Sequence, residues 1–169
     1  RQMCIRDRPD TVTAEKLAAL KSAGVGRISI NPQSFNDDVL AAIGRRHTVR
    51  QTLDAFALAR EAGFDNINMD FIAGLPKDDI KFFKHSIETA LSLGAESVTV
   101  HTLCLKTGAY MVTRDNVFDH GDIDTVNKMV DFSREYLSGA GYVPYYMYRQ
   151  KNTVGNLENV GSVSYTHLT

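Results

Sequence analysis

Asn66–Pro76 has the sequence Asn-Ile-Asn-Met-Asp-Phe-Ile-Ala-Gly-Leu-Pro, and this stretch decides which fold the chain can adopt. A short apolar run that stops at Gly74 and Pro76, between two helical patterns, is typical of a buried parallel strand. Asp70 is the exception within it, because a buried carboxylate is costly unless it is paired or hydrogen-bonded. At the carboxyl end of a strand in a βα fold, ligands often supply such partners. Asp70 is therefore a candidate binding residue, and capping of a neighbouring loop is the structural alternative.

Composition limits the classes of protein to which the chain can belong. The 169 residues suit one domain, and 43% hydrophobic with 23% charged residues is typical of a soluble globular protein. A net charge of −1 does not favour nucleic acid as a partner, and no apolar run approaches the roughly 20 residues of a membrane span. The sequence therefore predicts no nucleic-acid partner and no membrane partner.

The cysteine content points to a reducing, cytoplasmic setting. The only two cysteines, Cys4 and Cys104, lie far apart in the sequence. They form neither a disulfide framework nor a cysteine-rich metal motif, so no metal site is expected within this chain.

Both ends of the chain lack a periodic pattern. Residues 1–8 (RQMCIRDR) and 164–169 (SYTHLT) resemble translated sequencing-adapter read-through, and we expect them to be non-native. The natural part is then Pro9–Val163, with both natural termini missing. Ordinary frayed ends are the alternative.

Helical and strand patterns alternate along the rest of the chain. Thr48 and Gln51, for example, form a capping box in front of an amphipathic helix. The patterns predict helices over 13–24, 36–44, 48–63, 78–94 and 122–137, strands over 27–31, within 66–76, over 97–103 and over 142–148, and a loop over 149–163.

This alternation predicts an α/β fold with a parallel sheet and right-handed crossovers. An open doubly wound sheet and part of a βα barrel are both compatible with it. The G-x-G-x-x-G and Walker fingerprints are absent from the sequence. Polar residues lie near the carboxyl ends of three successive strands, at Gln33, at Asp70, and at His101 with Thr102. A barrel would bring those ends together around one pocket, and this favours the barrel.

Four segments in order carry a resemblance to a known family. They are RISINPQSF (27–35), GRRH (44–47), AGFDNINMDFIAGLP (62–76) and SVTVHTLCL (97–105). Together they resemble the oxygen-independent coproporphyrinogen III oxidases, or coproporphyrinogen dehydrogenases, which are radical S-adenosylmethionine (SAM) enzymes. The resemblance covers nearly all of residues 9–163.

The resemblance implies the C-terminal part of a (β/α)6 partial barrel that works with SAM and a [4Fe-4S] cluster. It divides the chain into a partial barrel over 9–141 and the start of a C-terminal, substrate-side region over 142–163. It implies oxidative decarboxylation of coproporphyrinogen III to protoporphyrinogen IX in haem biosynthesis, with an electron donor as partner. The cofactors supply the difficult chemistry, and the protein orients them.

The resemblance also implies roles for particular residues. Gln33, Arg45 and Asp70 match family positions that hold SAM, and Cys104 matches a position that contacts adenine through its backbone. Their chemistry suits these roles, because Gln33 can donate and accept hydrogen bonds and Arg45 can bind a carboxylate through its fork of N–H groups. A solvated charge at a helix end is the alternative for Arg45.

The chain departs from the family pattern at the cluster. The family holds its cluster with C-x-x-x-C-x-x-C, and neither this motif nor the glycine-rich SAM loop occurs in the sequence. Both precede the matched region, so we expect the cluster ligands upstream and the chain alone to be inactive. A natural member that has lost its cluster is the alternative. Cys104 replaces a smaller residue, which a backbone contact tolerates.

Substrate contacts are less well defined by the sequence. His101, Arg149 and Lys151 are candidates, the two cations because they could pair with propionate groups. A core histidine and ordinary surface charges are the alternatives. The tyrosines of 142–148 are either simple packing residues or a platform for a porphyrinogen.

Two other functions remain compatible with the sequence. One is a haem chaperone of the same superfamily, which binds rather than oxidises. The other is an unrelated βα-barrel lyase, which would need a nucleophilic lysine or a phosphate loop at a strand end, and the sequence shows neither.

Overall fold

The computed structural model describes residues 4–103, 123–149 and 158–164. Their elements, in chain order, are β1 (Cys4–Asp7), the 3-10 helix η1 (Pro9–Thr11), α1 (Ala14–Ser22), β2 (Arg27–Gln33), α2 (Asp37–Ala42), α3 (Val49–Glu61), β3 (Ile67–Ala73), α4 (Ile80–Ser92), β4 (Ser97–Thr102), α6 (Ile123–Gly139), β5 (Tyr142–Arg149) and β6 (Glu158–Ser164).

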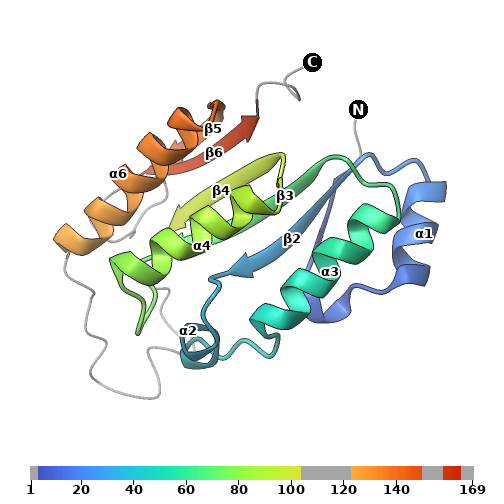
Figure 1. Cartoon of the computed structure of the whole chain (residues 1–169), viewed down its shortest axis with the longest axis horizontal. Coiled ribbons are helices and arrows are strands. Elements are labelled where there is room, and N and C mark those ends of the chain that lie inside the picture. Colours follow the sequence, from blue (N-terminus) through green and yellow to red (C-terminus); the bar gives the residue numbers. More distant parts are fainter. Residues whose placement is uncertain (1–3, 104–122, 150–157, 165–169) are drawn as a thin grey trace.

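The described strands form one mostly parallel sheet in the order β1-β2-β3-β4-β6-β5. Strands β1 to β4 are parallel, and β3 lies between β2 and β4. Helices α3, α4 and α6 lie together in front of the sheet (Figure 1). The expected α/β class and the barrel-like layering are therefore confirmed.

Helix starts follow the capping chemistry of the sequence. The Thr48 side chain accepts from the backbone N–H of Gln51, and the Gln51 side chain accepts from the backbone N–H of Thr48, which completes the expected capping box. Thr13 and Asn36 cap α1 and α2. Asp79 caps α4 by accepting from the backbone N–H of Phe82 at 2.7 Å.

Within the apolar stretch Asn66–Pro76, residues Ile67–Ala73 form β3, the central parallel strand. Met69 and Phe71 have no exposed surface and belong to the main core beneath the helices. Asn68 and Asp70 alternate with them and line a hollow with the polar residues of neighbouring strands. The side-chain period of two in a strand thus separates an apolar, helix-covered face from a polar one.

The region after β4 differs from the expected parallel arrangement. Glu158–Ser164, expected to be loop as far as Val163, forms β6 and pairs antiparallel with both β4 and β5. The segment resembled a loop because Gly161 interrupts it and Asn159 is polar. Asn159 is nevertheless fully buried, since its Oδ1 accepts from the backbone N–H of Thr102 at 2.7 Å.

The first described residues belong to the sheet. Cys4–Asp7 forms β1 and pairs with β2, with Ile5 opposite Ile28. Residues 1–8 carry no periodic pattern in the sequence, yet Cys4–Asp7 pairs along the edge of β2. That the segment is non-native stays a prediction.

Candidate functional site

A hollow of about 350 Å³ lies on the polar side of the sheet. It is lined by residues from four strands: Arg27 and Ser29 of β2, Asn68 and Asp70 of β3, Thr99 and His101 of β4, and Tyr145, Tyr146 and Tyr148 of β5. Neighbouring parallel strands place alternate side chains at matching heights, so groups distant in the sequence converge here.

Asn68 is the centre of the polar network beneath this hollow. Its Nδ2 donates to Ser29 Oγ at 3.0 Å and to Asp70 Oδ1 at 2.6 Å. Its Oδ1 accepts from Ser97 Oγ at 2.8 Å and Thr99 Oγ1 at 3.0 Å. The amide therefore uses both donors and both acceptor sites, which fixes its orientation at 3% exposure.

Asp70 is held as a buried carboxylate at the side of the hollow. Oδ1 accepts the short bond from Asn68, and Oδ2 lies 3.9 Å from His101 Nε2. The side chain is only 4% exposed, whereas the histidine ring is 23% exposed. A carboxylate in such a site can accept hydrogen bonds from the hydroxyl groups of a ligand.

Arg27 connects the network to the tyrosines of β5. Its Nη2 donates to Ser97 Oγ at 3.1 Å and to the phenolic oxygen of Tyr145 at 3.0 Å. The guanidinium carbon also lies 5.5 Å from the centre of the Tyr145 ring. Sequence reasoning treated neither residue as a network member, because their contact joins positions 118 residues apart.

Gln33 ends β2, the strand adjacent to that of Asp70. A register shift after Ile30 brings Gln33 opposite Phe71, and its backbone has a positive φ of 71°. A non-glycine residue in that region is uncommon and often marks a functional segment. Gln33 is 8% exposed and is not among the residues that line the hollow.

Arg45 and His47 follow α2 but differ in exposure. Arg45 is exposed, and its backbone N–H donates to Leu40 O at 2.9 Å. His47 is buried at 3% exposure, with Nε2 3.0 Å from Pro32 O. Burial lowers the pKa of His47, since desolvation disfavours the imidazolium, and the contact with Pro32 opposes this only in part. His47 thus attaches this loop to the end of β2.

The remaining candidates are only partly placed. Cys104 and Lys151 lie outside the described residues, and Arg149 is described only as the last residue of β5, opposite Glu158. The network members Ser29, Asn68 and Thr99 were not singled out from the sequence. A usable signal was the spacing of Asn68 and Asp70, because residues two apart in a strand share a face.

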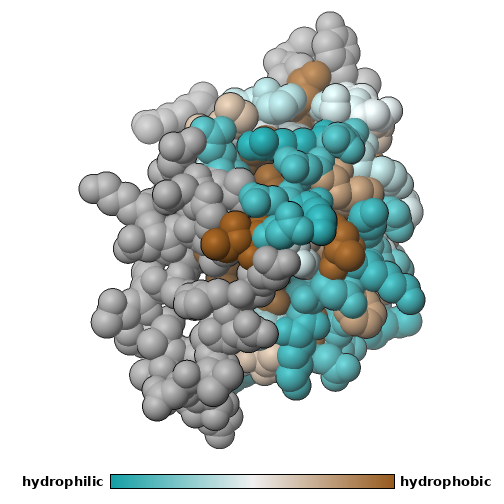
Figure 2. Space-filling view, turned by 90° about the vertical axis from the view of Figure 1, so that its left-hand side faces the viewer, coloured by the Kyte–Doolittle hydropathy of each residue, from teal (hydrophilic) through white to brown (hydrophobic). Residues whose placement is uncertain are grey.

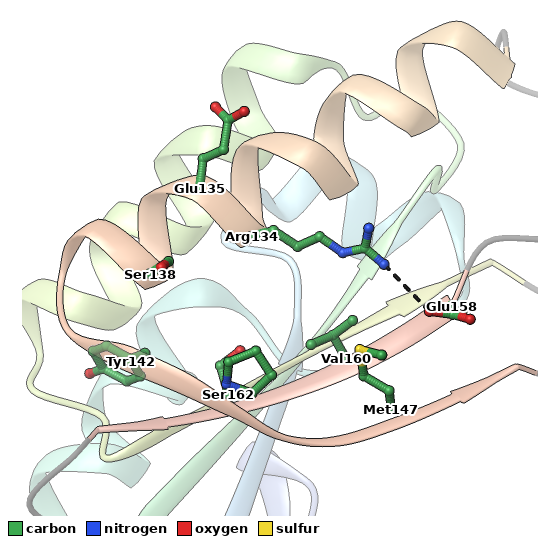
Figure 3. A pocket seen from close by; sticks show the side chains of 9 residues that line it. Arg134, Glu135, Ser138, Tyr142, Met147, Glu158, Val160 and Ser162 are labelled. Atoms are coloured by element: carbon green, nitrogen blue, oxygen red, sulfur yellow. Dashed lines mark ion pairs between the residues drawn. The ribbon is translucent and has the colours of Figure 1, made fainter.

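A second depression lies on the helix side, between α6 and the β5–β6 pair. It measures about 510 Å³, with Tyr142, Pro144 and Val160 along the strands. Figure 3 shows Arg134 reaching from α6 toward Glu158, at 3.8 Å. This groove carries no cluster of functional groups comparable with the Asp70 hollow.

A third depression, of about 500 Å³, lies along α6 beside Phe132, Glu135 and Tyr136. On the side seen in Figure 2, the coloured residues are mainly hydrophilic, with hydrophobic ones in small separate groups. None of the described helices is both long and apolar enough to cross a membrane. Within the same residues, no group of three or more His, Cys, Asp or Glu side chains could hold a metal ion.

Parallel strands with helices on one face and a polar hollow on the other define the chain as part of an open βα barrel. The chain belongs to the radical SAM superfamily, whose family model matches residues 2–90. The superfamily works with SAM and a [4Fe-4S] cluster, but the described residues provide no ligands for the cluster.

Curated relatives are named for oxidase-like and chaperone functions. The chain is 47% identical to the oxygen-independent coproporphyrinogen-III oxidase-like protein HemZ of Bacillus subtilis, over 91% of this chain and 31% of that protein. It is 45% identical to the haem chaperone HemW of the same organism, over 62% of this chain and 28% of that protein. The chain thus spans about a third of the length of these relatives.

Solved structures support the fold. The chain matches coproporphyrinogen III oxidase (HemN) from Escherichia coli with a TM-score of 0.75 at 23% identity, over 84% of this chain and 33% of that chain. It matches the archaeal Elp3 of Methanocaldococcus infernus with a TM-score of 0.70 at 18% identity, over 78% of this chain and 32% of that chain.

Proposed function

We propose that this chain forms the SAM-binding part of a radical SAM enzyme that decarboxylates coproporphyrinogen III oxidatively to protoporphyrinogen IX. The single observation that carries the proposal is Asp70, a buried carboxylate fixed by Asn68 at the side of a hollow on the open face of the sheet. The oxidase-like relative at 47% identity supports the choice of reaction.

Asp70 would hold the ribose of SAM by accepting hydrogen bonds from its hydroxyl groups. The carboxylate needs no rearrangement for this, because Asn68 already fixes one of its oxygens. Gln33, at the end of the adjacent strand, would bind a polar group of SAM. Arg45 would bind the carboxylate group of SAM. Cys104 remains a proposed backbone contact to adenine. When bound, SAM supplies the radical chemistry, and these residues only bind and orient it.

The described residues do not fit the cluster. Ligation of a [4Fe-4S] cluster depends on cysteine thiolates, and the whole chain has two cysteines, a hundred positions apart. We therefore propose that the cluster ligands lie on other residues of a longer protein.

The substrate would be coproporphyrinogen III, and the enzyme would need an electron donor. His101, which lines the hollow beside Asp70, is the best placed of the proposed substrate contacts. Arg149 and Lys151 remain proposals for the propionate groups. We also propose a cytoplasmic protein without nucleic-acid or membrane partners.

The second candidate function is a haem chaperone. The observation in its favour is the 45% identity to HemW of Bacillus subtilis. A hybrid protein, in which this chain replaces the matching third of HemZ, separates the two functions. Formation of protoporphyrinogen IX under anaerobic conditions supports the oxidase. Transfer of haem to an apoprotein, without decarboxylation, supports the chaperone.

The SAM site itself is tested by calorimetry on Asp70→Ala. Removal of the carboxylate should weaken SAM binding by about 1–3 kcal/mol, the cost of deleting a hydrogen-bond partner in a buried site. Asp131→Ala is the matched control, because Asp131 is an exposed residue of α6. An unchanged dissociation constant in a folded Asp70→Ala protein would leave Asp70 with a purely structural role.

A further inference from the structure

Three tyrosines of β5 form one side of the hollow that holds Asp70. Tyr145, Tyr146 and Tyr148, here called the aromatic wall, all line this hollow. Regular alternation along a strand would place Tyr145 on the opposite face from Tyr146 and Tyr148. Their convergence therefore needs a local departure from regular geometry.

A β-bulge provides that departure. Pro144 lies opposite Ser162 and Tyr146 lies opposite Gly161, so Tyr145 is an extra residue between two consecutive partners. Pro144 and Met147 line the groove on the helix side of the sheet. Tyr145, Tyr146 and Tyr148 are thereby left on the other face. Bulges that redirect side chains in this way are frequent beside active sites.

Gly161 of β6 makes room for the rings. A Cβ at this position would lie 3.0 Å from both Tyr145 Cε1 and Tyr146 Cδ1. The two rings therefore lie directly on the backbone of β6, and a methyl group at Gly161 would require them to shift by a few tenths of an ångström. Arg27 fixes the outer end of the wall through its hydrogen bond to the Tyr145 oxygen.

The wall is exposed and not flat. The exposed fractions of Tyr145, Tyr146 and Tyr148 are 44%, 41% and 36%. Neighbouring ring centres lie 6.0 and 5.3 Å apart, and successive ring planes are tilted by 33° and 36°. Aromatic faces at such tilts suit a ligand whose own rings are tilted relative to one another.

We propose that the aromatic wall is the substrate-binding surface of the hollow and that it selects a bent tetrapyrrole over a flat one. The inference rests on the proposed function, which assigns the Asp70 side of the hollow to SAM. A porphyrinogen has four separate pyrrole rings joined by saturated carbons, so each ring can lie against a different tyrosine. A porphyrin or haem is one rigid plane and cannot follow the tilted wall.

The test compares coproporphyrinogen III with coproporphyrin III, which carry the same side chains and differ in the oxidation state of the macrocycle. Anaerobic calorimetry on the 169-residue chain should give about tenfold tighter binding of the porphyrinogen, since aromatic contacts contribute about 0.5–1.5 kcal/mol each. Equal or tighter binding of coproporphyrin III would overturn the inference.

Variants of the aromatic wall test whether its tyrosines cause the preference for the porphyrinogen. Replacement of Tyr146 and Tyr148 together by leucine should weaken porphyrinogen binding about tenfold or more, and Gly161→Ala should do the same by displacing the rings. Tyr136→Leu is the matched control, because Tyr136 is similarly exposed at 39% but lies on α6. If circular dichroism shows that Gly161→Ala does not fold, porphyrinogen binding by the double leucine variant still tests the inference. Unchanged binding of the porphyrinogen by the double leucine variant would overturn the inference.

SAM titrations of the same proteins separate this inference from the proposed function. The wall variants should bind SAM as the parent chain does. If the parent chain binds SAM but neither tetrapyrrole, the inference fails and the SAM site stands. The same holds if the wall variants lose affinity for SAM rather than for the porphyrinogen. If the parent chain does not bind SAM, the proposed function fails.

Discussion

Asn68 Nδ2 donates a 2.6 Å hydrogen bond to Asp70 Oδ1, across two positions of the same strand. The amide is itself held by hydroxyl groups on both neighbouring strands. The position of the carboxylate is therefore set by the packing of three strands rather than by a loop.

Asn68→Ala should reduce both stability and SAM affinity. It leaves buried groups of Ser29, Asp70 and Ser97 without their amide partner, which should lower the free energy of unfolding by about 1–3 kcal/mol. Urea denaturation measures this loss, and calorimetry measures the affinity. Asn127→Ala on α6 is the control. A stability loss with unchanged SAM affinity would contradict the positioning role.

Glu96 should matter more for stability than its surface location suggests. Its Oε1 pairs with Arg60 Nη2 at 2.6 Å and its Oε2 accepts from the backbone N–H of Ile67 at 2.9 Å. Glu96→Ala should cost about 2 kcal/mol in chemical denaturation, because a part-buried donor loses its acceptor. Asp54→Ala, which breaks an exposed pair with Arg50, should change stability by less than about 0.5 kcal/mol. Equal losses of stability in Glu96→Ala and Asp54→Ala would contradict the expected importance of Glu96.

Asp78 should make the fold less stable as pH rises. Burial raises the pKa of this carboxyl from 3.8 to about 7, and the charge of Asp79 adds to the shift. Between these values the folded state holds the proton and the unfolded state does not, so the unfolding free energy falls as pH increases. Asp78→Asn should remove this fall, which is worth at most about 4 kcal/mol.

The measurement is urea denaturation of both proteins from pH 4 to pH 8. The stability advantage of Asp78→Asn should be small near pH 4, should grow toward pH 7 and should level off above it. A constant difference across this range would show that the carboxyl titrates normally in the fold.

The 169-residue chain alone should show no decarboxylase activity. Its two cysteines cannot supply three thiolates to a cluster. Reconstitution with iron and sulfide, followed by SAM, reductant and coproporphyrinogen III, should give neither a [4Fe-4S] absorption nor protoporphyrinogen IX. Turnover would contradict the assignment of the cluster ligands to other residues.

Local sequence patterns predicted the parallel half of the fold and singled out Asp70, which lines the candidate hollow. Thr48 and Gln51 form a capping box that depends only on neighbouring residues, and Asp70 stands out as the one carboxylate in an apolar strand. Both signals lie within a few positions of the sequence, where helix and strand periods can be recognised.

Long-range pairing could not be predicted in the same way. Gly161 and Asn159 made β6 resemble a loop, because the benefit of a glycine there comes from the tyrosines of another strand. The Arg27–Tyr145 contact and the bulge at Tyr145 likewise depend on which strands become neighbours. A single sequence carries no local signal for such choices.

We propose that SAM binds in the hollow beside Asp70. Titration of SAM into the isotope-labelled chain, followed by NMR, tests it most directly. We expect changes in amide chemical shift to concentrate at Asn68–Asp70 of β3 and Thr99–His101 of β4, and to be lost in Asp70→Ala. Shifts confined to the groove between α6 and β5, or no shifts at millimolar SAM, would contradict it.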